Sequence, residues 1–311
     1  MDNADLNKNV AKHAKRYSKE KRRPSVPVPM DDMALSETLK LMFNVTHFYP
    51  DLSEAFSKSI PNLFKILFRI RIPKPALQPP VNYLINALIN LDLEDKKSYF
   101  GGSQVFPKFD QNANAQQLIN ILDQAITQYP KAELDQLAAP VLTLIRRIYE
   151  FAPDNVKRHM QVLLLPTDEE RSRPLGQSDT VSSRLLRLST SPLTPNLRDS
   201  ISSLFFELSG KDATVFVRNV GYGFASGFLM SNNIAVPESA TDAWSTSGKN
   251  GEQEDINPVT GQRRSAESGS TEPEMTQEEK EREAERLFVL FERYACVKCL
   301  LLPIVANKVS D

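Results

Sequence analysis

The sequence predicts an all-α protein: an armadillo/HEAT-like superhelical repeat (α-solenoid), followed by a mobile linker and a C-terminal helix. Three observations predict this fold. Between residues 33 and 231, apolar residues recur at spacings of three and four, as in amphipathic helices. Prolines separate these segments, and the alternation typical of strands is scarce. Helix pairs recur roughly every forty-odd residues, the spacing of HEAT and armadillo repeats. A compact helical bundle is the alternative architecture.

The first 32 residues carry a strongly basic block at 8–23. We interpret 1–32 as a solvated and partly disordered lead-in to the first repeat, because charge runs of this kind are usually solvated. The 311 residues have a net charge of −1, so no global field attracts the chain to nucleic acid. We therefore expect no nucleic-acid partner.

The repeat region, 33–231, begins with "MALSETLKLMFNVTHF", in which Leu35, Leu39 and Met42 share one helical stripe. "PPVNYLINALINL" starts with prolines, which the first turn of a helix tolerates. Thr194 before Pro195 predicts a helix start, and Gly210 predicts its end. The segment "ATVFVRNVG" at 213–221 resembles a strand, but we interpret it as a short helix within the helical region.

Glycines gather in "NVGYGFASGFLMSNN" at 219–233. The cluster lacks the Lys-Ser/Thr of a phosphate-binding P-loop, and no βαβ unit precedes it. Glycines 221, 223 and 227 instead predict a tight corner between helices with close backbone approach.

The composition changes after the repeats. Residues 232–274 are rich in Ser, Gly, Glu and Pro, which predicts a disordered linker. Thr276 and Glu279 form a capping box that predicts an amphipathic helix at 275–293. Its apolar side chains need a partner, and the candidates for contact are Leu287, Phe288 and Phe291. Residues 294–311 form an atypical tail.

The sequence contains no constellation that indicates catalysis. Its three histidines lie in unrelated settings, and no G-x-S-x-G elbow is present. Cys296 and Cys299 have C-x-x-C spacing but lack the further ligands that a structural zinc site needs, so we expect neither metal nor cofactor. The start lacks an apolar signal region, and no apolar run is long enough to span a bilayer, so a cytoplasmic protein without a transmembrane segment is expected.

Asparagines indicate a surface for a polypeptide. Asn82, Asn86 and Asn90 recur at i, i+4 and i+8 on one face of an apolar helix, and Asn44 extends the row on the neighbouring repeat. Amides both donate and accept hydrogen bonds, so such a row can hold a peptide or tie neighbouring backbones together. Arginines add candidate carboxylate-binding forks, although solvated arginines are the more common case. These arginines are Arg146, Arg147, Arg184 and Arg187.

Several motifs then resemble one family. "TSP" (190–192), "GYGFASG" (221–227), "INPVTGQ" (256–262) and "EEKEREAERLFVLFER" (278–293) resemble, in order, the C-terminal half of the synembryns. These are cytosolic chaperones and guanine-nucleotide exchange factors for G-protein α subunits. The resemblance covers roughly 8–293 and is closest to a fungal branch.

The resemblance implies an armadillo/HEAT-type superhelix that performs no bond chemistry. It implies that a concave groove holds the C-terminal helix of a G-protein α subunit, GDP-bound or nucleotide-free, and that the helix at 276–293 packs against the nucleotide-binding domain. We expect a monomer, recruited to the plasma membrane through its partner. The chain begins at a point that looks internal to the family, so we expect partial activity. The alternatives are a non-catalytic armadillo-type adaptor for another peptide and a fragment without a stable fold.

Overall fold

A computed structural model describes residues 3–20, 29–93, 105–237, 256–267, 281–282 and 285–286. The chain divides into two compact units, Met1–Glu267 and Ser268–Asp311. In the second unit only Glu281–Arg282 and Glu285–Arg286 are described, and both pairs are helical. The candidate helix residues Leu287, Phe288 and Phe291 and the tail at 294–311 lie outside the described residues.

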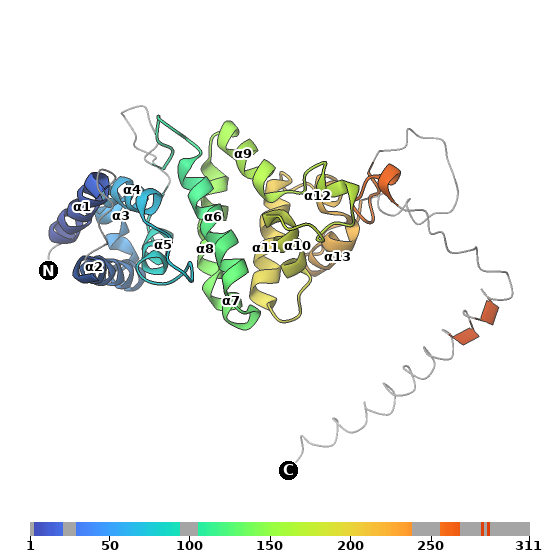
Figure 1. The fold of residues 1–311 in the computed structure, drawn as a ribbon, viewed down its shortest axis with the longest axis horizontal. Coiled ribbons are helices and arrows are strands. Elements are labelled where there is room, and N and C mark those ends of the chain that lie inside the picture. Colours follow the sequence, from blue (N-terminus) through green and yellow to red (C-terminus); the bar gives the residue numbers. More distant parts are fainter. Residues whose placement is uncertain are drawn as a thin grey trace, which may run out of the picture. The chain divides into compact units, whose positions relative to one another are not determined.

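The first unit is built from helices (Figure 1). Over the ranges that the structure describes, the only β-type pairing is an isolated bridge between Ile256 and Arg263. The α-helices are α1 (Asn3–Glu20), α2 (Pro29–Phe48), α3 (Ser53–Phe56), α4 (Ile60–Arg69), α5 (Val81–Ile89), α6 (Ala113–Gln128), α7 (Lys131–Leu137), α8 (Ala139–Phe151), α9 (Asp154–Leu164), α10 (Val181–Ser189), α11 (Pro195–Leu208), α12 (Ala213–Val220) and α13 (Tyr222–Ser231). Short 3-10 turns lie at Pro50–Leu52, Ser57–Ser59, Glu170–Ser172 and Arg264–Ala266.

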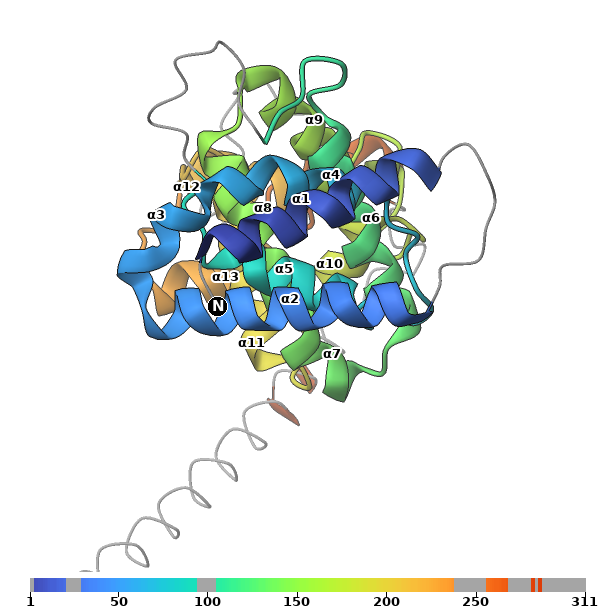
Figure 2. The ribbon, with the colours of Figure 1, turned by 90° about the vertical axis from the view of Figure 1, so that its left-hand side faces the viewer.

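The helices stack in two layers. We define the first layer as α1, α4, α6 and α9, and the second layer as α2, α5, α8 and α11; within each layer every helix packs on the next. Pairs such as α1 with α2, α4 with α5 and α6 with α8 join the layers. Figure 2 shows α1 beside α4, with α2 in the other layer. One continuous hydrophobic core runs between the layers, as expected of an α-solenoid.

The sequence separation of the side-chain hydrogen bonds between successive repeats indicates the repeat length. Asn90 of α5 donates to the carbonyl of Phe43 on α2, 47 residues earlier. Arg147 of α8 reaches back 58 residues to Ile89, and Arg146 binds Glu207, 61 residues further on. The expected spacing of forty-odd residues therefore describes only the first step. Later steps are longer because α7 lies between α6 and α8 in the chain, and α10 lies between α9 and α11.

The expectation of a solvated lead-in at 1–32 is wrong for the part described. Residues 3–20 form α1, and its Leu6, Val10 and Ala14 are fully or almost fully buried. The helix packs along α4, and Asn7 donates to the carbonyl of Ala55 at 3.0 Å. Three apolar residues at a spacing of four suffice to bury one face of a helix whose other face is basic.

The expectation of a disordered linker at 232–274 is wrong for residues 256–267, which belong to the first unit and dock at the start of α13. We call this segment the strap. The N–H groups of Tyr222 and Gly223 donate to the carbonyls of Pro258 and Val259, at 2.8 and 3.0 Å. The guanidinium of Arg171, 5% exposed, donates to the carbonyl of Gly261 at 2.7 Å. Backbone hydrogen bonds thus hold a segment that has little apolar surface to bury.

The predicted corner is confirmed at Gly221, whereas Gly223 and Gly227 lie within α13 and Gly227 has no close neighbour. Gly221 ends α12 and precedes α13 with φ +82° and ψ 147°, a conformation that essentially only glycine adopts. A Cβ there would lie 2.7 Å from the carbonyl carbon of Thr260, so the absence of a side chain also admits the strap. The predicted helix at 213–221 is confirmed as α12, whose first turn is capped by Asp212, which accepts from the N–H of Val215 at 2.9 Å.

Candidate functional site

The candidate site is a trough along the second layer, formed where α5, α8 and α11 lie side by side. Two hollows open between these helices. The smaller, of about 140 Å³, lies between α5 and the α7–α8 turn. The larger, of about 580 Å³, lies between α8 and α11. One face of α8 contributes to both, because its residues Pro140, Thr143, Arg147 and Glu150 follow helical spacing.

The asparagine stripe meets the trough over part of its length. Asn82 and Asn86 line the smaller hollow, opposite Gln136 and Leu137. The Oδ1 of Asn82 accepts from the N–H of Tyr83 at 2.8 Å, while the amide of Asn86 has no hydrogen-bond partner among the described residues. The walls are otherwise apolar: Leu77, Ile85, Pro140 and Val141. This hollow therefore suits an apolar side chain accompanied by a polar backbone group.

The two outer asparagines behave differently. Asn90 donates to the carbonyl of Phe43 at 3.4 Å and so ties α5 to α2. Asn44 is exposed on α2 and lines neither hollow. The structure therefore brings two members of the stripe together at a hollow, uses a third as an internal tie, and leaves the fourth at the surface.

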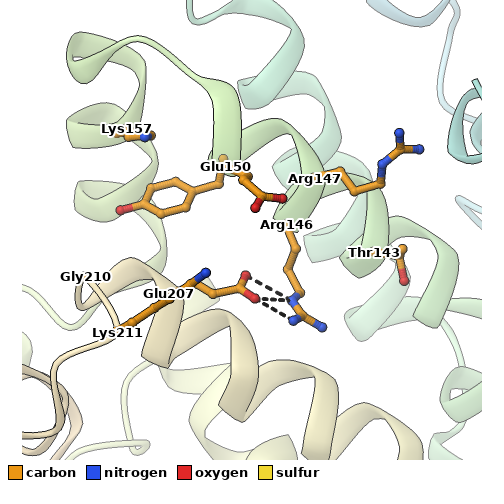
Figure 3. A pocket seen from close by; sticks show the side chains of 9 residues that line it. Thr143, Arg146, Arg147, Glu150, Lys157, Glu207, Gly210 and Lys211 are labelled. Atoms are coloured by element: carbon orange, nitrogen blue, oxygen red, sulfur yellow. Dashed lines mark hydrogen bonds and ion pairs between the residues drawn. The ribbon is translucent and has the colours of Figure 1, made fainter. Parts of the chain in front are cut away.

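The larger hollow is strongly charged (Figure 3). Its cationic side chains come from α8, α9 and the turn after α11, and two carboxylates accompany them. The lining residues that carry charge are Arg146, Arg147, Lys157, Lys211, Glu150 and Glu207. Cations outnumber carboxylates, so the hollow favours an acidic or amide-rich group.

Arg146 and Arg147 face this hollow, but both already have acceptors. Arg146 grips Glu207 of α11 through Nε and Nη2, at 2.5 to 3.1 Å, and this hydrogen bonding raises the pKa of the Arg146 guanidinium. Arg147 donates to the carbonyls of Ile89 and Leu91 at the end of α5, the latter at 2.9 Å. Both arginines hold neighbouring repeats in register and shape the trough wall.

Arg184 and Arg187 of α10 lie outside both hollows. Arg184 binds Asp123 of α6 at 2.5 Å and also pairs with Asp179. Arg187 is exposed, and its Nη1 donates to the carbonyl of Gly176 at 2.6 Å. The structure thus gives each of the four predicted arginine forks an internal partner.

Sequence analysis missed several trough residues: Gln136, Leu137, Lys157, Glu207 and Lys211. The spacing of Thr143, Arg146 and Glu150 on one face of α8 was an available signal. No sequence signal marked Lys157 and Glu207, because they reach the hollow from helices other than α8, namely α9 and α11.

Other kinds of site receive no support from the described part of the chain. No cluster of three or more His, Cys, Asp or Glu side chains there is arranged to hold a metal ion, and Cys296 and Cys299 fall outside it. None of the described helices combines the length and the apolar character that crossing a bilayer requires.

Stacked helix pairs with a hollowed second layer define an α-helical repeat protein of the armadillo/HEAT type. Comparison of the sequence with protein families places it more narrowly. The family described as guanine nucleotide exchange factor synembryn matches residues 3–298, and the chain belongs to this family.

Two relatives show the extent of the likeness. A synembryn-like chaperone of Schizosaccharomyces pombe is 32% identical over 172 residues, which cover 52% of this chain and 32% of the relative. The chaperone Ric-8 of Drosophila pseudoobscura pseudoobscura is 31% identical over 188 residues, which cover 57% of this chain and 32% of the relative. The matched part of the chain therefore spans about a third of the length of each of these relatives.

Proposed function

We propose that the chain binds a G-protein α subunit, GDP-bound or nucleotide-free, and acts on it as a guanine-nucleotide exchange factor and folding chaperone. Membership of the synembryn family supports the general role. The observation that carries the proposal is the trough along α5, α8 and α11, which is hollowed at two successive helix junctions. A trough of this kind fits an extended or helical segment of another polypeptide.

The two hollows differ in chemistry and so give the bound segment a direction. The smaller one takes an apolar side chain, and the free amide of Asn86 meets a polar group beside it. The larger one takes a polar or acidic group near Arg146, Lys157 and Lys211. Stacked helices lie about 8–10 Å apart. Two turns of a helical ligand cover about 10 Å, so an apolar residue and an acidic residue seven positions apart reach successive hollows.

Exchange activity requires no bond chemistry at this site. A protein that binds the nucleotide-free form of its partner more tightly than the GDP form shifts the population toward the nucleotide-free form. By the same linkage, bound GDP weakens the complex to the same extent. The helix expected at 275–293, with Leu287, Phe288 and Phe291, supplies a second contact in this proposal.

The test is the affinity of the chain for a purified, nucleotide-free G-protein α subunit. Asn82→Ala combined with Asn86→Ala should weaken binding by about 30-fold, because two amide contacts of about 1 kcal/mol each are lost. The control is Asn90→Ala, which removes the tie to Phe43 and should change thermal stability more than affinity. Equal affinity of the double variant and the unaltered chain would contradict the proposal that the trough binds the G-protein α subunit.

An armadillo-type adaptor for another peptide is the second candidate, since the trough itself does not require exchange activity. The two functions differ in one observable. An adaptor binds its peptide and leaves the rate of GDP release from a G-protein α subunit unchanged.

A further inference from the structure

The first layer carries a face whose chemistry the proposed function does not use. On α1, Lys12 and Lys15 are exposed on the side of the helix away from the buried Leu6, Val10 and Ala14 stripe. On α4, Lys65 is exposed one turn before Phe68. Lys108 and Phe109 precede α6, and the ring of Phe109 contacts that of Phe68 with centroids 6.1 Å apart. We call Lys12, Lys15, Lys65, Lys108 and Phe109 the basic-aromatic face.

These residues lie on adjoining elements. α1 packs along α4, and α4 packs on α6. Asn7 of α1 contacts Ala55 and Ser59, which are 48 and 52 residues later. Since α1 runs beside α4 in the same direction in Figure 2, that offset places Lys12 and Lys15 level with Lys65 and Phe68.

The cations of this face are not neutralised locally. Lys12, Lys15, Lys65 and Lys108 form no ion pair with any side chain that the structure describes. On the same elements, Asp5 pairs with Lys8 at 3.7 Å. Asp110 follows Phe109 and is exposed; it accepts from the N–H of Asn112 at 3.0 Å and keeps its negative charge. The four lysines of the face therefore leave an excess of positive charge beside this one carboxylate, on a chain whose net charge is only −1.

Phe109 is the second feature. Its side chain is 75% exposed, the largest exposure among the bulky apolar residues of the described chain, and it follows Lys108 directly. A ring that projects from a loop, with cations around it, has the chemistry of a membrane-interface anchor: the ring enters the headgroup boundary while the lysines meet anionic lipid. A protein partner would have to supply a matching pocket, whereas a bilayer accommodates a projecting ring without one.

We propose that the basic-aromatic face docks the chain peripherally on a bilayer that contains anionic lipid. This contact is with lipid directly and does not depend on the trough or on a G-protein α subunit. Each lysine near an anionic surface contributes about fivefold to the partition coefficient, which corresponds to roughly 1 kcal/mol.

The test is co-sedimentation of the full chain with phosphatidylcholine vesicles, with and without phosphatidylserine. Binding should require phosphatidylserine and weaken with salt. Lys12→Gln combined with Lys65→Gln should lower the partition coefficient by about 25-fold, and Phe109→Ser by about fivefold. Lys131→Gln on α7 and Leu193→Ser, which removes a side chain 65% exposed on another loop, are matched controls and should have little effect.

Equal binding to neutral vesicles, or equal losses in the control variants, would overturn the proposal. So would a chain that ignores the vesicles yet binds an acidic peptide in a manner sensitive to Lys12→Gln and Phe109→Ser. That outcome would assign the face to a protein partner instead of lipid.

Discussion

Replacing Gly221 by alanine tests the link between the glycine cluster and the strap. The residue has φ +82°, and an added Cβ would lie 2.7 Å from the carbonyl carbon of Thr260 and 2.8 Å from the nitrogen of Gly261. Both are backbone atoms, so the clash with the added Cβ cannot be relieved by the movement of a flexible side chain. The substitution must therefore strain the corner between α12 and α13 or displace the strap.

The expected magnitude has two parts. Glycine-only backbone strain costs about 1–3 kcal/mol, and each strap hydrogen bond that is lost removes about 1 kcal/mol. The backbone strain destabilises the corner whether or not the strap is docked, so only the contact with Thr260 and Gly261 weakens docking. Loss of the two hydrogen bonds from Tyr222 and Gly223 to the strap weakens docking by about 2 kcal/mol. The population with an open strap then rises roughly 30-fold, since 1.4 kcal/mol corresponds to a factor of ten.

Two other glycines provide matched controls. Gly227 lies inside α13, where an added Cβ would meet no atom within 4 Å outside its own helical turn, so Gly227→Ala should stabilise the helix by about 0.5–1 kcal/mol. Gly210 has φ +70° but open space around it, so Gly210→Ala should cost backbone strain without releasing the strap.

Limited trypsin digestion followed by mass spectrometry measures the open strap through cleavage after Arg264, and urea unfolding gives the stability of the unit. Cleavage should accelerate in Gly221→Ala and stay unchanged in the Gly210 and Gly227 variants. Indistinguishable cleavage rates for Gly221→Ala and Gly227→Ala would refute the assignment of this glycine to strap docking.

Two further predictions concern the buried carboxylate of Glu170, which accepts hydrogen bonds from Ser182 and Ser183, and the C-terminal segment. Burial raises the pKa of Glu170, but hydrogen bonds from Ser182, from the N–H of Thr167 and from two further hydroxyls outweigh it and lower the pKa overall. The stabilisation is therefore present above the unfolded pKa of about 4.3 and is lost as pH falls through the folded value. Glu170→Gln should lower the free energy of unfolding by about 1–3 kcal/mol at neutral pH. It should also reduce the loss of that free energy as the pH falls, measured by urea unfolding at a series of pH values. An unchanged pH dependence in the variant would exclude the Glu170 carboxylate as its cause. Removal of 272–311 should slow GDP release from a G-protein α subunit, measured with a fluorescent nucleotide, and an unaltered rate would show that the segment at 287–291 is idle.

Local pattern was sufficient to predict the helical class and individual helices. The helix at 213–220 was predictable despite its strand-like "VFV", because Asp212 and Gly221 mark its two ends. α1 was missed because its lysines dominate the composition, although Leu6, Val10 and Ala14 repeat at helical spacing.

The strap and the arginine partners were not predictable from local pattern. The strap is held through backbone groups, which side-chain composition does not report. Arg146 and Arg184 each find a carboxylate 61 residues away, so their pairing depends on how repeats stack. The trough was predicted in part: Asn82 and Asn86 share a helical face that sequence reveals, while Lys157 and Glu207 reach it only through tertiary packing.

The rate of GDP release from a purified G-protein α subunit, measured with and without the full chain, tests the account most directly. We predict faster release with the chain and a return toward the intrinsic rate when Asn82 and Asn86 are both replaced by alanine. Release at the intrinsic rate, with no complex detected on gel filtration, would contradict the account.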